Sequence, residues 1–189
     1  MVGIRMGLGL FALLWLAAAG TIGQGNDEGG DRGYWPSFRG PDASGILEEQ
    51  DLPLEWDGDS GRNIAWKREI PGLAHSSPIV WGNRLFLTTA VNLEAQASYK
   101  HGLYGAGTAA DDVSQVHRWQ VYCLDARSGR TIWVRTAYEG TPDFKRHIKS
   151  TYASSSPATD GRRVAAFFGS QGLYVYDMDG DLLWSKNLG

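Results

Sequence analysis

The chain has 189 residues and a formal net charge of −3, from 18 Lys and Arg against 21 Asp and Glu. This slight acidic excess argues against a nucleic-acid-binding surface, which needs clustered Lys and Arg to neutralise phosphates. Eight Trp, eight Tyr and 25 Gly favour an all-β protein built from short strands and tight turns.

The first 24 residues have the pattern of an export signal. Arg5 is followed by an apolar run, MGLGLFALLWLAAAG at 6–20, which ends in small residues typical of a signal peptidase site. The run is shorter than the about 20 apolar residues that a membrane-spanning helix needs. We therefore predict a signal peptide at 1–24 and a flexible linker at 25–33. The mature chain is expected to be periplasmic or extracellular without a transmembrane helix, and a retained anchor is the alternative.

Two stretches repeat along the rest of the chain. HSSPIVWGNRLFLTTA at 75–90 matches SSSPATDGRRVAAFFGS at 154–170, and VYCLDARSGRTIW at 121–133 matches LYVYDMDGDLLW at 173–184. In the first pair, a Gly-Asn or Asp-Gly dipeptide separates apolar runs, which indicates a β-hairpin. The pattern predicts strands at 76–81, 84–90, 119–125 and 130–135 in the first unit, and at 155–159, 163–169, 172–177 and 181–186 in the second.

Each unit is therefore a four-stranded meander, and such units in tandem are typical of a β-propeller, in which each blade packs against the next. The two blade-like units span 75–135 and 154–189, and residues 92–117 form an insertion within the first. We predict that 34–189 is a partial propeller of about two blades.

The outermost strand of each unit ends in a tryptophan. Trp66, in a third and partial copy at 64–72, matches Trp133 and Trp184. A large aromatic side chain at this position can bury much area against a neighbouring blade. We predict that these tryptophans dock adjacent blades, and that the matching turns with Asp125, Gly129, Asp177 and Gly180 belong to the same structural set.

Three segments carry a resemblance to a known family. WPSFRGPDASGI (35–46), AWKREIPGLAHSSPIVWGNRLFLTTA (65–90) and HIKSTYASSSPATDGRRVAAFFGSQGLYVYDMDGDLLWSKNLG (147–189) resemble the secreted bacterial proteins with repeats like those that bind pyrroloquinoline quinone (PQQ). The related propellers include quinoprotein dehydrogenases and outer-membrane assembly propellers. Propellers close with about four to eight blades, so we expect the chain to be the N-terminal part of a longer protein. Assembly of several chains is the alternative.

The resemblance implies one enzymatic function that has to be weighed. The alcohol-oxidising quinoproteins use PQQ, a calcium ion, an aspartate base and often a vicinal pair of cysteines. Cys123 is the sole cysteine of the chain, and it lies in a strand-like segment where we expect it to be buried and inert. We predict no cofactor for this chain, because PQQ with calcium follows from the resemblance alone.

Two histidines are candidates for a ligand site. His75 and His147 precede the two inner strands, and the loops that enter inner strands converge on one mouth of a propeller's central channel. A ligand site at that mouth, with Arg39 or Lys149 nearby, is the expected place in such a ring. The alternative is that each imidazole hydrogen-bonds a loop backbone. No catalytic or metal-binding residue is predicted.

Other motifs do not support a specific chemistry. The turns DGDSG (57–61) and DMDGD (177–181) faintly resemble calcium loops, but the second lacks a downstream bidentate acid, and we predict hairpin turns. GLYGAG (102–107) does not have the glycine spacing of a nucleotide loop. His101 and His117, which bracket the insertion with Asp111 and Asp112, match no metal-ligand spacing.

The leading function hypothesis is an exported binding or scaffolding module for a protein or a small ligand, with no nucleic-acid partner. The first alternative is the N-terminal part of a PQQ-dependent dehydrogenase. A third is a carbohydrate-binding surface protein that uses an exposed tryptophan such as Trp81. Trp35 and Phe38, which precede the first blade, are expected to pack as a closing strand or a cap.

Overall fold

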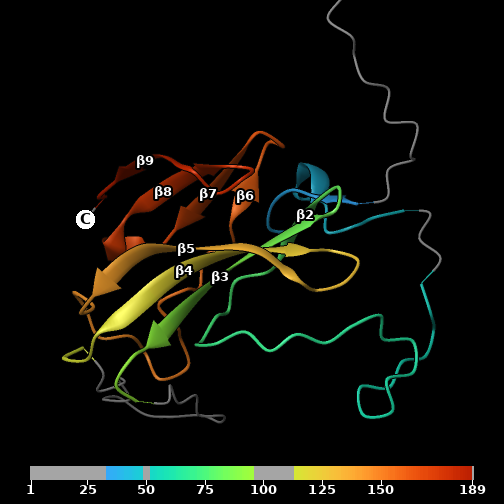
Figure 1. The fold of residues 1–189 in the computed structure, drawn as a ribbon, viewed down its shortest axis with the longest axis horizontal. Coiled ribbons are helices and arrows are strands. Elements are labelled where there is room, and N and C mark those ends of the chain that lie inside the picture. Colours follow the sequence, from blue (N-terminus) through green and yellow to red (C-terminus); the bar gives the residue numbers. More distant parts are fainter. Residues whose placement is uncertain (1–32, 49–51, 96–112, 189) are drawn as a thin grey trace, which may run out of the picture. The chain divides into compact units, whose positions relative to one another are not determined.

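The computed structural model describes residues 33–48, 52–95 and 113–188, which form two antiparallel β-sheets (Figure 1). The first sheet consists, in spatial order, of β1 (Tyr34–Trp35), β2 (Ile79–Trp81), β3 (Arg84–Asn92), β4 (His117–Asp125) and β5 (Thr131–Gly140). The second consists of β6 (Ala158–Thr159), β7 (Arg163–Phe167), β8 (Leu173–Asp177) and β9 (Leu182–Lys186). The prediction of an all-β chain with propeller-like four-stranded units is confirmed.

Two short 3-10 turns complete the secondary structure of the described ranges, η1 (Pro41–Ala43) and η2 (Gly169–Gln171). No helix in these ranges is long and apolar enough to cross a membrane. The predicted signal peptide at 1–24 lies outside the described residues, and so does the predicted linker at 25–33 apart from Gly33. GLYGAG, His101, Asp111 and Asp112 lie outside them too.

The inner strands are shorter than predicted. The segments 76–78 and 155–157 contain Ser-Ser-Pro and precede β2 and β6 without joining a ladder. Proline has no N–H to donate to a neighbouring strand, so pairing begins only after it. Conversely, β3, β4 and β5 extend to the base of the insertion, because the ladder continues from Arg84↔Asp125 to Asn92↔His117.

Two segments before β2 differ from expectation in opposite ways. Tyr34 and Trp35 form a fifth strand beside β2, in register with Trp81 and Val80, so a closing strand is found there. The outer strand expected at 64–72 is absent, because residues 64–70 have no ladder. Among the described residues, this segment has no neighbouring strand to pair with. Without a partner it cannot form the hydrogen bonds of a β-ladder.

The two sheets are equivalent at their outer strands. Trp133 of β5 pairs with Cys123, and Trp184 of β9 pairs with Val175. A register shift follows at once in each ladder, next to Leu124 in the first sheet and next to Tyr176 in the second. A bulge of this kind bends the strand and increases its local twist, so both outer strands leave their sheets in the same way.

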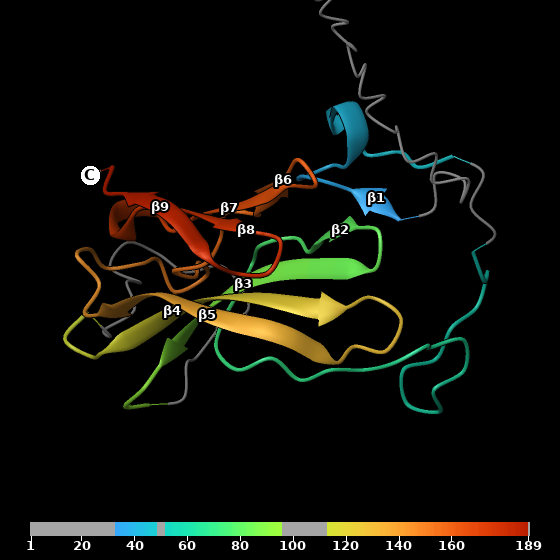
Figure 2. The same ribbon diagram turned by 45° about the horizontal axis from the view of Figure 1, so that its top comes forward.

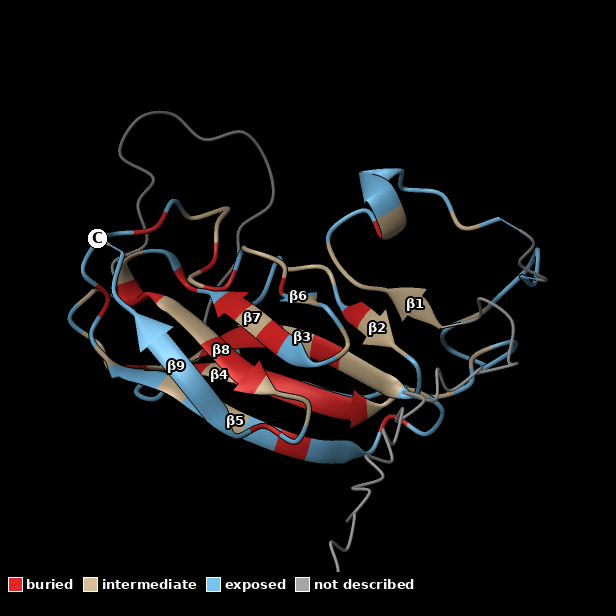
Figure 3. Cartoon of the chain, turned by 90° about the horizontal axis from the view of Figure 1, so that it is seen from above, coloured by how far each residue is buried: buried red, intermediate tan, exposed pale blue. Residues whose placement is uncertain are grey.

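The core lies between the sheets, as the second sheet stacks over the first (Figure 2). Its largest fully buried side chains include Trp119, Phe86 and Ile79 from the first sheet and Val164 from the second. β4 is buried along most of its length. β9, by contrast, is exposed at every residue (Figure 3).

Candidate binding site

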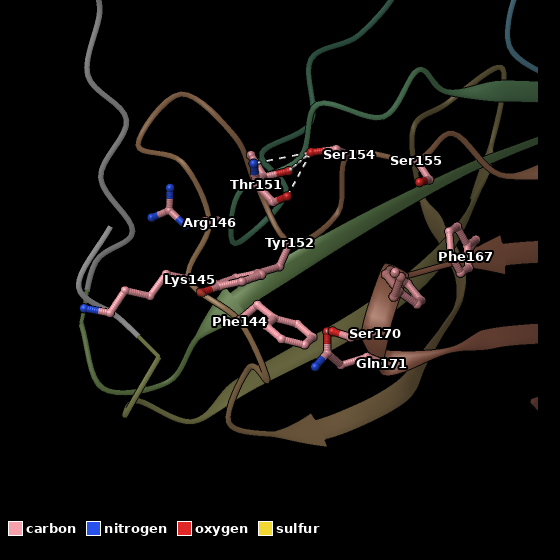
Figure 4. A pocket seen from close by; sticks show the side chains of 12 residues that line it. Phe144, Lys145, Arg146, Thr151, Tyr152, Ser154, Ser155, Phe167, Ser170 and Gln171 are labelled. Atoms are coloured by element: carbon pink, nitrogen blue, oxygen red, sulfur yellow. Dashed lines mark hydrogen bonds between the residues drawn. The ribbon is translucent and has the colours of Figure 1, made fainter. Parts of the chain in front are cut away.

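A pocket of about 230 Å³ lies where the connection between β5 and β6 meets the turn between β7 and β8 (Figure 4). The long connection, 141–157, supplies one wall, and η2 with the end of β7 supplies the other. The lining combines aromatic rings, hydroxyl groups and basic side chains. The aromatic members are Phe144, Tyr152, Phe167 and Phe168.

The long connection is held in shape by its own hydroxyl groups and by the core. The Ser154 hydroxyl donates to the Thr151 carbonyl oxygen (2.8 Å), and the two hydroxyl oxygens are 3.1 Å apart. The fully buried Trp119 donates its indole N–H to the carbonyl oxygen of Tyr152 (3.1 Å). A buried polar group that is satisfied in this way fixes the local backbone. The wall is therefore ordered before any ligand arrives.

Arg146 brings a positive charge to this wall although it is only 8% exposed. Its guanidinium donates to the Ser150 carbonyl oxygen (2.9 Å) and lies over the Tyr152 ring, 5.7 Å from the centroid. Arginine tolerates this position because its planar group can stack on an aromatic face and hydrogen-bond at its edge at the same time.

The opposite wall is tied to the first through one side-chain bond. The Gln171 side-chain N–H of η2 donates to the Asp143 carboxylate (3.1 Å), and the Gln171 amide oxygen accepts a hydrogen bond from the Ser170 hydroxyl (3.0 Å). Phe144 and Phe167 remain exposed, at 70% and 39%. Exposed rings beside an ordered polar wall are suited to bind an apolar side chain of a partner.

The predicted histidines lie beside this pocket without lining it. The segments that carry His75 and Ala153 are adjacent, because the His75 N–H donates to the Ala153 carbonyl oxygen (3.2 Å). The His147 Nδ1 accepts the backbone N–H of Lys149 (3.1 Å), which is the loop-backbone bond expected in the alternative interpretation. Arg39 donates to the Ser44 carbonyl oxygen (3.3 Å). A role of either histidine in ligand binding stays a prediction.

Two of the three predicted docking tryptophans lie on turns of the following unit. The Trp66 indole N–H donates to the Ala126 carbonyl oxygen (3.0 Å), and the Trp133 indole N–H donates to that of Met178 (2.9 Å). A Cβ on Gly129 would be 2.5 Å from the Trp66 ring, and a Cβ on Gly180 would be 2.8 Å from the Trp133 ring. Only glycine permits this approach.

The aspartates that open these turns organise their backbones. The Asp125 carboxylate accepts the N–H and the hydroxyl of Ser128 (2.8 and 2.6 Å), and these bonds lower the pKa of Asp125. Asp177 accepts the N–H groups of Asp179 and Asp181 (2.9 and 2.8 Å). DMDGD is thus a hairpin turn whose first carboxylate is engaged by the backbone.

A family model described as outer membrane protein assembly factor BamB matches residues 44–189. The chain belongs to this family of PQQ-like β-propeller repeat proteins. The match begins before the first complete sheet, so it includes the partial copy around Trp66. No curated protein matches the chain.

Membership in the BamB family raises the question of PQQ, and the described residues do not fit that cofactor with its calcium ion. Cys123 is the sole cysteine, is fully buried in β4, and cannot supply a vicinal pair. This burial confirms the expectation of a buried thiol, and it raises the pKa of the thiol to about 12. Within 33–48, 52–95 and 113–188, no three His, Cys, Asp or Glu side chains are grouped to hold a metal ion.

The pocket was not predicted from the sequence. Phe144, Arg146 and Tyr152 belong to the connection between the two units, where no repeat pattern points to them. The available signal was an aromatic and basic cluster just before the second unit. Trp81, expected to be exposed, is instead half-buried against the Tyr34 ring at 4.8 Å and over Gly161. The sequence could not show this because β1 had no assigned partner.

Proposed function

We propose that the chain is an exported binding and scaffolding module of the cell envelope whose pocket takes an apolar side chain of an extended polypeptide. The observation that carries this proposal is the pocket with exposed Phe144 and Phe167 at the mouth of an ordered polar wall. The matching family is described as an assembly factor for outer membrane proteins, which supports a polypeptide as the partner.

The size of the pocket favours a side chain over a whole small molecule. Sites for drug-sized ligands have about 300–1,000 Å³, whereas this pocket has about 230 Å³. Nascent outer-membrane strands alternate apolar and polar residues and carry aromatic girdles. A strand of this pattern would place an aromatic ring between the two phenylalanines while its backbone meets the hydroxyl groups of the rim, such as Ser155 and Ser170.

The test is fluorescence anisotropy with a short fluorescein-labelled peptide of alternating aromatic and polar residues. We expect saturable binding, and we expect Phe144→Ala to weaken it about tenfold. Full burial of a phenylalanine ring contributes roughly 1.5–3 kcal/mol, and a tenfold loss corresponds to the lower end of that range. Ile46→Ala is the matched control, because Ile46 is exposed to a similar degree (63%) and does not line the pocket. Absence of binding, or equal affinity of the Phe144→Ala protein, would contradict the proposal.

A further inference from the structure

The pocket between the β5–β6 connection and η2 is basic as well as aromatic. Lys145 and Arg146 are among its lining residues, and no Asp or Glu is among the described residues that line it. The chain as a whole has a net charge of −3, so the pocket differs in sign from the overall charge. A positive site on an acidic protein is a local feature that a ligand of opposite charge can recognise.

The acidic side chain closest in sequence to this basic pair does not reverse the charge. Asp143 stands two residues before Lys145 and accepts the Gln171 side-chain N–H (3.1 Å), the bond that ties the two walls together. Asp143 does not line the pocket. Along 143–149, three basic side chains, of which Lys149 is the third, stand against this one carboxylate. This part of the wall therefore has a net positive formal charge.

Neutral groups help to hold Arg146 in place. Its side chain is largely buried, and its guanidinium contacts the Ser150 carbonyl oxygen (2.9 Å) and the Tyr152 ring (5.7 Å to the centroid). These two partners carry no formal charge, so they orient the guanidinium without cancelling its charge. A charge in such partly dry surroundings attracts an opposite charge more strongly than a charge in open water does, and salt screens it less.

The place for an aromatic ring and the place for a negative charge are neighbours in this pocket. Figure 4 shows the Tyr152 side chain between Arg146 and Phe144. A ligand ring that packs on Phe144 and a ligand carboxylate that pairs with Arg146 would therefore contact one continuous wall. A planar guanidinium suits a carboxylate, because its N–H groups match the two carboxylate oxygens.

Strand geometry decides where along a bound polypeptide this carboxylate stands. Successive side chains of an extended chain point to opposite faces, and side chains two residues apart point to the same face. The ring and the carboxylate must share a face to contact the same wall, so the acidic residue lies two positions from the aromatic residue rather than next to it. In outer-membrane strands, aromatic girdles flank the apolar band, so a charge two positions beyond a girdle residue falls outside that band.

We propose that the pocket selects polypeptide segments in which an acidic residue lies two positions from an aromatic residue, with the ring beside Phe144 and the carboxylate at Arg146, assisted by Lys145. This inference rests on the proposed function, because it requires that an extended polypeptide enters the pocket. It adds a rule of sequence selection that the aromatic surface alone does not provide. An aromatic strand without a carboxylate at that spacing binds more weakly.

Isothermal titration calorimetry with unlabelled peptides tests this rule, since a fluorescein label would itself bring negative charge. Three end-blocked heptapeptides carry one central phenylalanine in a serine background. The first has glutamate two positions to each side of the ring, the second has glutamate one position to each side, and the third has glutamine two positions to each side. We expect the first to bind about tenfold more tightly than the third, through a charge-assisted hydrogen bond. The second has the composition of the first but should bind like the third.

Variants of the basic wall make the test specific to these side chains. The readout is the ratio of the affinities for the first and third peptides, because a general disturbance of the pocket affects both peptides alike. Arg146→Gln should lower this ratio from about ten to about one, and Arg146→Lys should retain part of it, since it keeps the charge. Lys145→Gln, at an exposed position, should lower the ratio by a smaller factor. Lys67→Gln is the matched control, because Lys67 is also exposed and does not line the pocket.

The possible failures of this inference and of the proposed function differ. Equal affinity of the parent protein for the first and third peptides would overturn the inference and leave the proposed function standing, because the ring alone would then explain binding. Tighter binding of the second peptide than of the first, or an unchanged ratio in the Arg146→Gln protein, would overturn it as well. If Arg146→Gln does not fold, the two glutamate peptides on the parent still decide. If no peptide binds, the proposed function is wrong and the inference falls with it.

Discussion

Trp133 and Trp184 occupy equivalent positions in the two sheets, yet Trp133 is buried and Trp184 is about half exposed. Both occupy the same ladder position beside the same register shift. The difference lies in what faces them: the Met178–Gly180 turn faces Trp133, and no described residue does the same for Trp184. A sheet of this fold therefore does not bury its own outer tryptophan; the following unit does.

The turns at Gly180 and Gly61 differ in the same way as the two tryptophans. Gly180 and Gly61 both have a positive φ, 87° and 77°, but a ring covers only the first. Glycine is required at both positions by backbone conformation. At Gly180 it is required a second time, by the close approach of Trp133.

The largest expected effect separates the two tryptophans. Trp133→Ala should lower the free energy of unfolding by about 3–5 kcal/mol, the usual cost of removing a buried aromatic side chain. Trp184→Ala should cost less than about 1 kcal/mol in dilute solution, where its ring faces water. Urea denaturation followed by circular dichroism measures both. Equal losses for the two variants would refute the difference between the two outer strands.

The two glycines provide a matched pair with a smaller expected effect. Gly180→Ala should destabilise the fold by about 3 kcal/mol, because strain at positive φ adds to a clash with the Trp133 ring. Gly61→Ala should cost about 1 kcal/mol, since only the conformational strain applies. The same denaturation experiment compares them. If Gly61→Ala proved as costly as Gly180→Ala, a side chain would already cover the turn at 57–62 within the folded chain.

The smallest effect concerns alkaline pH. Burial raises the pKa of Tyr176, which contacts Trp133, from 10.0 to about 12, and that of Cys123 from 9.0 to about 12. The folded protein keeps these protons where the unfolded chain loses them. Stability is therefore complete below about pH 9 and falls as pH rises toward 12.

Thermal unfolding at about pH 8 and about pH 11 measures this decline. Tyr176→Phe has no phenolic proton to lose, so its Tm should fall less between the two pH values than that of the parent. A parent Tm that does not change over this range, or an equal decline in the variant, would contradict the burial of the Tyr176 hydroxyl beside Trp133.

The fold could be predicted from the sequence because its information is local and repeated. The hairpin dipeptides, the apolar runs and the spacing from Asp125 to Trp133 and from Asp177 to Trp184 specify four strands per unit. The prediction of an outer strand at 64–72 was wrong. Trp66 contacts the turn of the first sheet through its bond to Ala126. A tryptophan alone, however, does not provide a neighbouring strand for its segment to pair with.

The pocket could not be predicted in this way, because contacts between distant residues shape it. Gln171 bonds to Asp143, and Trp119 bonds to the backbone at Tyr152. Neither pair follows from a repeat or a motif. The turn at 57–61 was visible in the sequence, but its likeness to the turns at Asp125 and Asp177 became clear only from the contacts that Trp66 and Trp133 make with those two turns.

Fluorine NMR of the chain labelled with 5-fluorotryptophan tests the central comparison most directly, with the resonances of Trp133 and Trp184 assigned by Trp→Phe substitution at each site. We predict that the Trp184 resonance shifts when H2O is replaced by D2O, because its side chain is 48% exposed, while the Trp133 resonance stays in place because its side chain is only 6% exposed. A Trp184 resonance without a solvent isotope shift, or a shift equal to that of Trp133, would contradict the account.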